Sequence, residues 1–397
     1  MFYQFLFTER RFKMKVSQIY ELTNTIAREL LGEQTIVAED LSNLVDIGKE
    51  FENTVGLDNY VRKLNDHIGK MVFVNRVYRG NVPSVFMDSW EFGSVIEKIT
   101  PIMPTAGVDE TWNLQNGQSY DNDIFYKPEI TVKCFNDRVT FEIPISIVEK
   151  QVKSAFNSAA EMNSFISMIY TAIENAMTVR LNSLIMRTIN NFIAETVYAE
   201  YAEVGLETKS TVKAVNLLKL FNDETGGNLT VSNALTNTDF LKYSSMKMAN
   251  YIDRMRSMSK LFNIGGTEKF TPDTENHVVL LSDFKNAANF YLQSNTFNEQ
   301  YTALPNAETV PFWQGSGTDY SFTDISKIIV KTSNNHTVTV TGIVGVMFDT
   351  NALGVSNVDR RVTTHYNAKG EFWNEFHKFT AGYFNDFNEN FVVFFIA

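Results

Sequence analysis

The sequence is poor in residues that build covalent or metal-bound frameworks. Cys134 is the only cysteine in 397 residues, so one chain can form neither an internal disulfide nor a site with several cysteine ligands. This fits a reducing compartment. The histidines show no pair at metal-ligand spacing such as His-x-x-x-His, so a structural role is expected for each. They are His67, His277, His336, His365 and His377.

Long apolar runs are also missing. No stretch reaches the ~18–20 apolar residues that a membrane-spanning helix needs, so no membrane association is expected. Residues 1–7 are apolar, but the basic residues follow this patch, whereas a secretory signal has them first. Met14 is a second candidate for the first residue, which would make residues 1–13 an upstream extension.

Common catalytic and cofactor motifs are absent as well. Gly315-Ser-Gly317 lacks the third glycine of a dinucleotide loop, and the sequence has neither a Gly-x-x-x-x-Gly-Lys-Ser/Thr phosphate loop nor a Gly-x-Ser-x-Gly elbow. Asp121-Asn-Asp123 begins like a calcium loop but has no following glycine or closing glutamate. We therefore predict no catalytic, cofactor-binding or metal-binding residues and no enzyme activity. A site assembled from scattered residues would escape this search.

Positive charge is scarce relative to negative charge. The formal net charge is −11, without a large block of either sign. Binding to a nucleic-acid backbone needs clustered lysine or arginine, so affinity for nucleic acid is not expected. An acidic surface does allow the protein to lie near DNA without adhering to it.

Proline and glycine are absent from residues 158–197, where the sequence predicts one very long helix. Apolar residues recur there at steps of three and four, which is typical of a helix with one buried face. About 40 residues correspond to a rod of roughly 60 Å. Ser158 and Glu161 have the spacing of a capping box at its start. The apolar positions are Met162, Phe165, Ile166, Ile169, Ile173, Met177, Leu181, Leu184, Ile185, Ile189, Phe192 and Ile193.

An aromatic, extended segment precedes this helix. Residues 105–123 are polar and turn-rich, and Asn116-Gly117 is a turn signal. Residues 130–135 and 139–143 read as strands joined by Asn136-Asp137. We interpret this segment as a long two-stranded projection. Because an isolated two-stranded ribbon is only marginally stable, it is expected to lie on another surface.

The remaining chain reads as mixed helix and sheet. Helices are predicted over 16–31, 39–53, 57–69, 210–222, 237–262 and about 283–293, and strands over 71–78, 278–281, 325–331, 338–349, 362–366 and 390–396. The last strand is apolar on both faces, which places it in the interior of a sheet.

The order of these parts resembles the major capsid proteins of tailed double-stranded-DNA bacteriophages, whose shared architecture is the Johnson fold. The resemblance covers about residues 16–397, and it depends on the order of several segments, none of them a catalytic motif. They are Met71-Val-Phe-Val-Asn-Arg-Val-Tyr78, Trp90-Glu-Phe-Gly93, Ile96-Glu-Lys-Ile99, Phe125-Tyr-Lys-Pro-Glu-Ile-Thr-Val132, Gly345-Val-Met-Phe-Asp-Thr-Asn-Ala352 and Phe391-Val-Val-Phe394.

The resemblance implies an α+β fold with a defined order of domains. It consists of an N-terminal helical arm, an extended β-hairpin loop, a long spine helix, a peripheral sheet and a mixed α/β axial domain. The implied ranges are 1–70 for the arm, 71–104 for the start of the peripheral domain, 105–143 for the extended loop, 144–204 for the peripheral domain with the spine helix, 205–325 for the axial domain, and 326–397 for the peripheral sheet and C-terminus.

The resemblance also implies function and partners. Copies would assemble through pentamers and hexamers into an icosahedral head shell that encloses double-stranded DNA without sequence-specific binding. Portal and scaffolding proteins would be further partners, with assembly in the host bacterial cytoplasm and the product in the virion. The extended loop would lie over a neighbouring subunit, and its large side chains are the expected contacts. These are Trp112, Tyr120, Phe125 and Tyr126.

Three alternatives stay open at this point. An encapsulin-type compartment shares the fold but packages an enzyme. Another tail or head protein of a phage, or an enzyme with scattered active-site residues, is also compatible. Some capsid proteins cross-link a loop lysine to a neighbouring asparagine; Lys127 and Lys133 lie in or near the loop, but no local pattern supports that chemistry.

Overall fold

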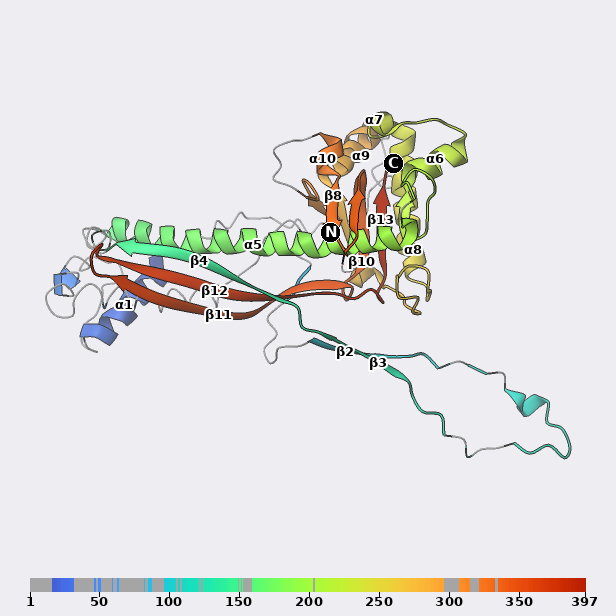
Figure 1. Cartoon of the computed structure of the whole chain (residues 1–397), viewed down its shortest axis with the longest axis horizontal. Coiled ribbons are helices and arrows are strands. Elements are labelled where there is room, and N and C mark those ends of the chain that lie inside the picture. The colour runs from blue at the N-terminus through green and yellow to red at the C-terminus, as the bar shows by residue number, and fades with distance from the viewer. Residues whose placement is uncertain are drawn as a thin grey trace, which may run out of the picture. The chain divides into compact units, whose positions relative to one another are not determined.

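The chain forms two compact units in a computed structural model (Figure 1). The structure describes residues 16–31, 96–148 apart from 105, 108, 121, 122 and 124, 159–295 apart from 203, 307–314, 321–332 and 335–397, with isolated positions between 46 and 87 and at 150 and 152. The first unit is formed from residues 1–89, 138–185 and 357–381, and the second from 90–137, 186–356 and 382–397.

A four-stranded sheet, in the order β1-β11-β12-β4, organises the first unit. Its strands are β1 (Phe86–Met87), β4 (Arg138–Val148), β11 (Leu353–Asn367) and β12 (Phe372–Asn385). On β12, buried side chains alternate with partly exposed ones from 374 to 381, as in a strand with one covered face. This unit also contains α1 (Val16–Leu31), which confirms the helix predicted over 16–31.

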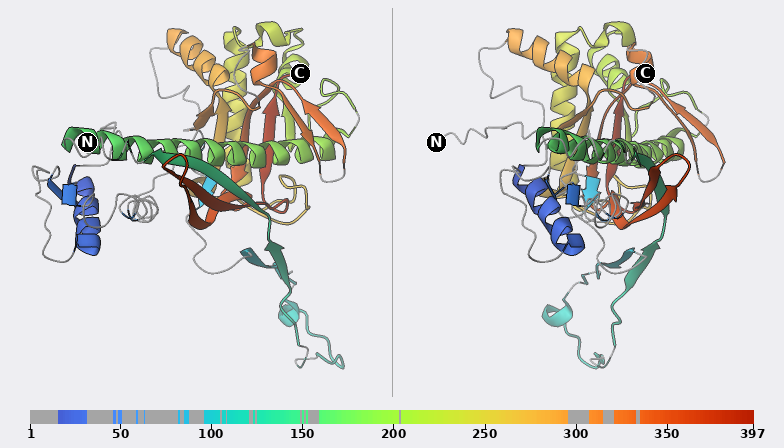
Figure 2. Two further views of the ribbon diagram at one scale, coloured as in Figure 1. Left: turned by 60° about the vertical axis from the view of Figure 1, so that its left-hand side comes forward. Right: turned by 90° about the vertical axis from the view of Figure 1, so that its left-hand side faces the viewer.

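Helix α5 (Ala159–Tyr201) is continuous over 43 residues, roughly 65 Å at the usual rise per residue. Its residues to 185 belong to the first unit and those from 186 to the second. Figure 2 shows the first part of α5 running alongside the sheet of its own unit. The predicted long helix is therefore confirmed, whereas Ser158, its expected cap, lies outside the described residues. The buried apolar side chains of α5 include Phe165, Ile169, Ile173, Met177, Leu181, Leu184, Ile185, Ile189, Phe192 and Ile193.

A five-stranded sheet, in the order β5-β13-β10-β6-β7, forms the core of the second unit. Strand β10 is antiparallel to both β13 and β6, whereas the β13–β5 and β6–β7 pairs are parallel. Every residue of β10 and β13 is buried, which confirms that the apolar run at 390–396 lies inside a sheet. The strands are β5 (Ala214–Asn216), β6 (Asn276–Leu281), β7 (Glu308–Val310), β10 (Ile343–Asp349) and β13 (Phe391–Phe395).

Short helices and one small two-stranded sheet complete the body of this unit. The helices are α6 (Leu217–Thr225), α7 (Val231–Ala234), α8 (Thr238–Met255), α9 (Ser282–Asn295), α10 (Phe322–Ile325) and the 3-10 turn η3 (Asp273–Glu275), and the small sheet pairs β8 (Ile328–Lys331) with β9 (Thr337–Val340). The Asn237 side chain accepts a hydrogen bond from the amide of Phe240 (2.9 Å) and so caps α8. The helices predicted near 237 and 283 are thus present, although the first ends at 255 instead of 262.

The helix predicted over 210–222 is wrong in its first half. Residues 214–216 form β5, which pairs in parallel with β13 from the C-terminal end of the chain. Asn216 then caps α6 by accepting a hydrogen bond from the amide of Lys219 (3.1 Å). The pairing with a distant strand overrides the local helical pattern, and Gly226 ends the helix in the left-handed conformation.

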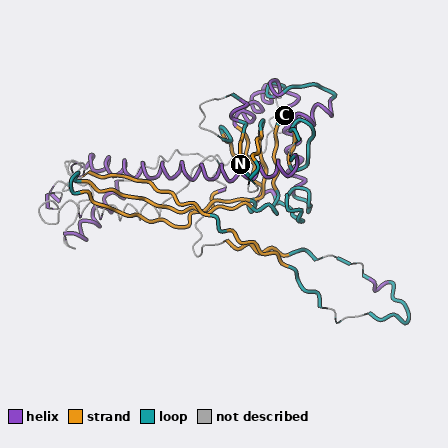
Figure 3. Tube along the Cα trace, viewed as in Figure 1, coloured by secondary structure: helices purple, strands orange, loops and turns teal. Residues whose placement is uncertain are grey.

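The ribbon, as we name strands β2 (Ile96–Pro101) and β3 (Ile130–Phe135), is a separate antiparallel pair in the second unit. It bounds residues 102–129, which we name the loop; Figure 3 shows the loop as mostly irregular chain beyond the ribbon. The expected hairpin between 130–135 and 139–143 is wrong, because β3 pairs with β2 and β4 joins the other sheet. A two-residue hairpin turn needs positive φ, which neither Asn136 nor Asp137 has.

The implied boundary between 205–325 and 326–397 also does not match the compact units. Residues 326–356 and 382–397 belong with 205–325 in the second unit, and only 357–381 belong to the first. The reason is that β10 and β13 are the central strands of the five-stranded sheet. A fully apolar strand is expected inside a sheet, but its composition does not say which sheet.

Several predicted elements lie outside the described residues. They include most of the helices at 39–53 and 57–69 and the strand at 71–78. Within the described part of the chain, no helix combines the length and apolarity needed to cross a membrane. The same residues contain no group of three or more histidine, cysteine, aspartate or glutamate side chains placed to hold a metal ion.

Candidate assembly interface

The four predicted contact residues all lie in the loop and are exposed to different degrees. Trp112 is 93% exposed, Phe125 83% and Tyr126 81%, whereas Tyr120 is 44% exposed. No ring-to-ring contact joins any two of these four described side chains. The loop therefore presents three separate aromatic side chains to solvent.

Two local networks order the loop. Asp109 accepts hydrogen bonds from the amide (2.9 Å) and hydroxyl (2.8 Å) of Thr111 at the 3-10 turn η2 (Glu110–Trp112), and these bonds lower the pKa of Asp109. At the Asn116-Gly117 turn, the Tyr120 hydroxyl accepts a hydrogen bond from the amide of Gln115 (3.0 Å), and Gly117 has φ of +86°. The predicted turn is thus present. Tyr120 stabilises it from within the loop, unlike the three more exposed rings.

The outer face of the ribbon is mostly apolar, although the exposed Glu97 also lies on it. Ile99 and Val132 are paired across the two strands, and both are exposed, as is Ile130. Half of the large apolar side chains that the described structure exposes lie between residues 99 and 132. Single exposed apolar residues are ordinary, but a concentration of this kind is typical of an interaction surface.

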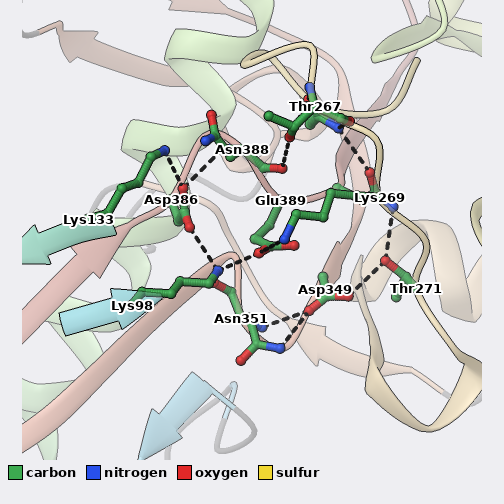
Figure 4. Close-up of polar contacts among 12 residues, drawn as sticks. Lys98, Lys133, Thr267, Lys269, Thr271, Asp349, Asn351, Asp386, Asn388 and Glu389 are labelled. Carbon is green, nitrogen blue, oxygen red and sulfur yellow. Dashed lines mark hydrogen bonds and ion pairs between the residues drawn. The ribbon is translucent and has the colours of Figure 1, made fainter. Parts of the chain in front are cut away.

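The inner face of the ribbon carries two lysines directly opposite each other. Lys98 of β2 and Lys133 of β3 are cross-strand partners, an arrangement of like charges that by itself destabilises a sheet. Asp386, which follows β12, lies between their ammonium groups. One of its carboxylate oxygens accepts from Lys98 at 2.8 Å and the other from Lys133 at 2.7 Å (Figure 4).

Glu389 extends this cluster to another segment of the second unit. One oxygen of Glu389 accepts hydrogen bonds from Lys98 and from Lys269 (2.8 Å), which lies between α8 and η3. The side chains of Asp386 and Glu389 are only 2% and 6% exposed. Buried carboxylates of this kind are stable only when charged donors satisfy them, as the three lysines do here. We name these five residues the lysine–carboxylate cluster.

The turn that carries the two carboxylates is itself rigidly held. The amide of Asp386 donates to the carbonyl of Ala352 (2.7 Å), and the amide of Asn388 donates to the carboxylate of Asp386 (3.1 Å). The Thr267 hydroxyl donates to the carbonyl of Asn388 (2.8 Å). The ring of Phe387 packs edge-on against Phe192 of α5, 4.8 Å between centroids. The turn with the anchoring carboxylates is therefore held by contacts that do not involve the ribbon.

The surroundings of Asp386 determine its protonation. Burial alone would raise the pKa of Asp386, but hydrogen bonds from Lys133 and Lys98, the charge of Lys98 and the amide of Asn388 together hold it below its ordinary value. The unfolded chain then binds this proton more readily than the folded chain. The stability that Asp386 contributes is complete above its unfolded pKa of about 3.9 and is lost as the pH falls through the lower folded value.

We expect acid to loosen the ribbon only below about pH 4. A fluorophore on Cys134, which is the single cysteine and is exposed on β3, would report this motion through its anisotropy. The anisotropy should stay constant from neutral pH down to mild acid and then fall as Asp386 is protonated. A change centred near pH 6 to 7 would contradict the assignment to this carboxylate.

The sequence matches one protein family almost from end to end. Residues 23–395 match the family model of the Phi29-like phage major capsid protein. The chain belongs to this family. It is a structural protein of a phage head shell, which is built from copies of this capsid protein and is part of the virion. Among curated proteins, none matches the sequence.

Solved phage capsid structures resemble this capsid protein distantly. The capsid structure of Staphylococcus phage Andhra is 10% identical over 81% of this chain and 86% of that chain, with a TM-score of 0.47. The capsid structure of cyanophage P-SCSP1u is 11% identical over 82% of this chain and 90% of that chain, with a TM-score of 0.44.

The family match separates the alternatives that the sequence left open. It favours a phage head shell over an encapsulin-type compartment and over another tail or head protein. It supports a structural role rather than an enzymatic one.

The lysine–carboxylate cluster of this capsid protein was missed from the sequence, apart from Lys133, which was considered for cross-linking. In the structure, the Lys133 ammonium is bound by Asp386. Asp386 and Glu389 are more than 250 residues from their ribbon partners, and sequence spacing does not indicate such contacts. One usable signal was available: Asp386 and Glu389 closely precede the buried strand β13, where unpaired acidic residues are costly.

Proposed function

We propose that this capsid protein builds an icosahedral shell from pentamers and hexamers in which the loop of each copy lies on a neighbouring copy. The observation that carries the proposal is the group of three exposed aromatic rings, Trp112, Phe125 and Tyr126, on a segment anchored at its base. A head-to-tail contact of this kind closes into rings when the rotation between copies permits.

The energetics of such a contact suit a shell. Burying one large aromatic side chain contributes about 1.5–3 kcal/mol, so three rings offer roughly 5–9 kcal/mol before the costs of ordering the loop and of association. Each contact remains modest, which allows wrongly placed copies to dissociate. Because every copy donates and receives a loop, many modest contacts add up to a stable closed shell.

The two units have natural places in the capsid architecture expected from the sequence. We assign the first unit, with its four-stranded sheet and the beginning of α5, to the peripheral domain and spine helix. The body of the second unit, with its five-stranded sheet, is assigned to the axial domain, whose tips would meet around the symmetry axes. The axial domain would then comprise residues 205–356 and 382–397 instead of 205–325. The C-terminal part of the peripheral domain would comprise 357–381 instead of 326–397.

We further propose the partners and place of assembly that accompany this role. The shell would enclose double-stranded DNA without sequence-specific contacts, which is consistent with a net charge of −11 and no large basic block. Portal and scaffolding proteins would join the assembly in the host bacterial cytoplasm. The role is structural throughout, without catalysis or a cofactor.

Replacing Trp112 by alanine is expected to impair shell assembly while leaving the fold intact. The side chain is 93% exposed, so its removal takes almost no packing from the isolated chain. It would remove one of three aromatic contacts per interface. Negative-stain electron microscopy would count closed particles, and thermal unfolding of unassembled protein would measure stability.

Two variants serve as controls for that experiment. Trp112→Phe keeps an aromatic ring and should largely preserve assembly. Val179→Ala removes an apolar side chain of α5 that is 66% exposed and lies outside the loop, so its effect should be smaller. Normal shells from Trp112→Ala, at the wild-type yield, would mean that the loop does not carry the contact.

A further inference from the structure

The junction between the ribbon and the body of the second unit is held by opposite charges. Three lysines meet two buried carboxylates: Lys98 from β2, Lys133 from β3 and Lys269 from the segment after α8, against Asp386 and Glu389. A third buried carboxylate, Asp349, lies beyond the ion pairs and binds the amide and side chain of Asn351, whose carbonyl accepts from Lys98. The five side chains of the cluster carry a net charge of +1, so both carboxylates are needed to offset the repulsion among the three lysines.

Asp386 is the member on which the ribbon depends most. It is the only one bonded to both strands, at two residues that face each other in the ladder. One carboxylate thereby fixes one rung of the ribbon, and with it the direction in which the loop leaves the body. Lys98 has a second partner in Glu389, whereas Asp386 is the one salt-bridge partner recorded for Lys133 within the described residues.

We propose that Asp386, supported by Glu389, is a positioning residue for the assembly interface: its negative charge holds the lysine face of the ribbon against the body and so aims the loop at a neighbouring copy. This inference rests on the proposed role of the loop. It assigns part of the interface to a turn more than 250 residues away from it in sequence.

We expect the negative charge of Asp386 to hold the ribbon against the body more than its hydrogen bonds alone do. Like charges directly opposite each other in a sheet repel, and the low local dielectric of a buried site strengthens that repulsion. Without the Asp386 charge, three lysines would share one carboxylate. Two contacts would remain at the base of the ribbon. The ring of Phe135 lies 5.1 Å from that of Phe384, between centroids, and the amide of Tyr383 donates a hydrogen bond to the carbonyl of Asp137 (3.1 Å). The ribbon would then stay attached at its base but lose its fixed direction.

The variant D386N removes the charge and also replaces the oxygen that accepts from Lys98 by an amide nitrogen, which cannot accept a hydrogen bond. Asparagine has nearly the same shape as aspartate and keeps the oxygen that accepts from the amide of Asn388, so the turn is preserved. Two spin labels would report the ribbon's direction: one on Cys134, which lies on the face opposite Lys133, and one introduced by A249C on the exposed side of α8. The labelled chain would be diluted with unlabelled protein, so that only distances within one chain are recorded.

We expect a single narrow label-to-label distance with Asp386 in place and a broad or shifted distribution in D386N. The decisive measurement is a rescue. K133M removes the lysine whose ion-pair partner has lost its charge. The double variant D386N/K133M should therefore regain the narrow distance, although it has fewer polar contacts than D386N. The matched control E142Q neutralises a carboxylate paired with Lys378 in the first unit and should leave the distance unchanged.

Two outcomes would overturn the proposal. One is a narrow, unshifted distance in D386N; the other is a double variant as disordered as D386N, because hydrogen bonding would then be what matters. Both measurements concern a single chain and do not depend on assembly. If the loop were not the interface, Trp112→Ala would assemble normally, while D386N would still change the label-to-label distance. Failure of the proposed function is therefore distinguishable from failure of this inference.

Discussion

Replacing Phe391 by alanine is expected to lower the free energy of unfolding of the second unit by about 3–5 kcal/mol. Phe391 begins β13 and is 1% exposed. Its ring stacks on Phe192 of α5, with 4.0 Å between centroids, and lies nearly parallel to Phe348 of β10 at 5.7 Å. Removing it would open a cavity where the helix meets the two central strands, and tightly packed rings cannot collapse to fill it.

Urea unfolding would measure this loss, and hydrogen exchange of the β10 and β13 amides would locate it in the second unit. Phe391→Leu should cost less, because it keeps most of the apolar volume. Phe290→Ala is the surface control: this ring is 70% exposed, so the expected change is within about 0.5 kcal/mol. A loss below about 1 kcal/mol for Phe391→Ala would contradict the packing described here.

The long helix was predictable because its signal is local. A run of residues without proline or glycine and with apolar side chains at steps of three and four specifies both the helix and its buried face. The buried apolar positions of α5 from Phe165 to Ile193 are among those that the periodicity selected. Helices α8 and α9 were found for the same reason, because their apolar periodicity is also local.

Sheet membership was not predictable, because it depends on pairings between distant segments. The composition of residues 391–395 indicated a buried strand, but not that it lies between β5 and β10. Residues 214–216 were read as helix because their partner strand is more than 170 residues away. The same limit explains why the boundary expected at 325 differs from those of the compact units.

Strand β12 was missed although part of its signal was visible. The turn before it carries Asn367 and Gly370, and the Asn367 side chain accepts hydrogen bonds from the amides of Lys369 (3.1 Å) and Gly370 (3.0 Å). Along β12, however, the buried face contains Glu375 and His377, 3.2 Å apart, while aromatic residues lie on both faces. Polar residues on the covered face hide the alternation from which strands are predicted.

The sequence indicated the loop and its large aromatic side chains, whereas it did not indicate the anchor of the loop. The residues Trp112, Tyr120, Phe125 and Tyr126 stay a prediction as contacts to a neighbouring copy. The anchor depends on the register that places Lys98 opposite Lys133, and on a third segment that brings Asp386 between them. A shift of one residue in either strand would turn its lysine to the other face. The sequence alone does not specify that register.

Replacing Gly342 by alanine is expected to destabilise the second unit by about 2–5 kcal/mol, through backbone strain and through a clash. Gly342 precedes β10 with φ of +74°, a conformation that costs an alanine about 1–2 kcal/mol. A Cβ atom there would lie 1.9 Å from the carbonyl oxygen of Ile396, which is backbone and cannot rotate away. The amide of Ile396 donates to the carbonyl of Gly342 (2.9 Å), so relieving the clash would also weaken the bond that holds the end of the chain.

Gly226→Ala separates the two causes. Gly226 ends α6 with φ of +66°, but no atom lies within 4 Å of the position that its Cβ would occupy, so only the strain applies. In urea unfolding, Gly342→Ala should therefore lose about 1–3 kcal/mol more than Gly226→Ala, and the excess should appear as faster hydrogen exchange in β10 and β13. Equal losses from the two variants would mean that the backbone at Ile396 moves aside freely. That result would contradict the tight packing of the five-stranded sheet at the C-terminal end of β13.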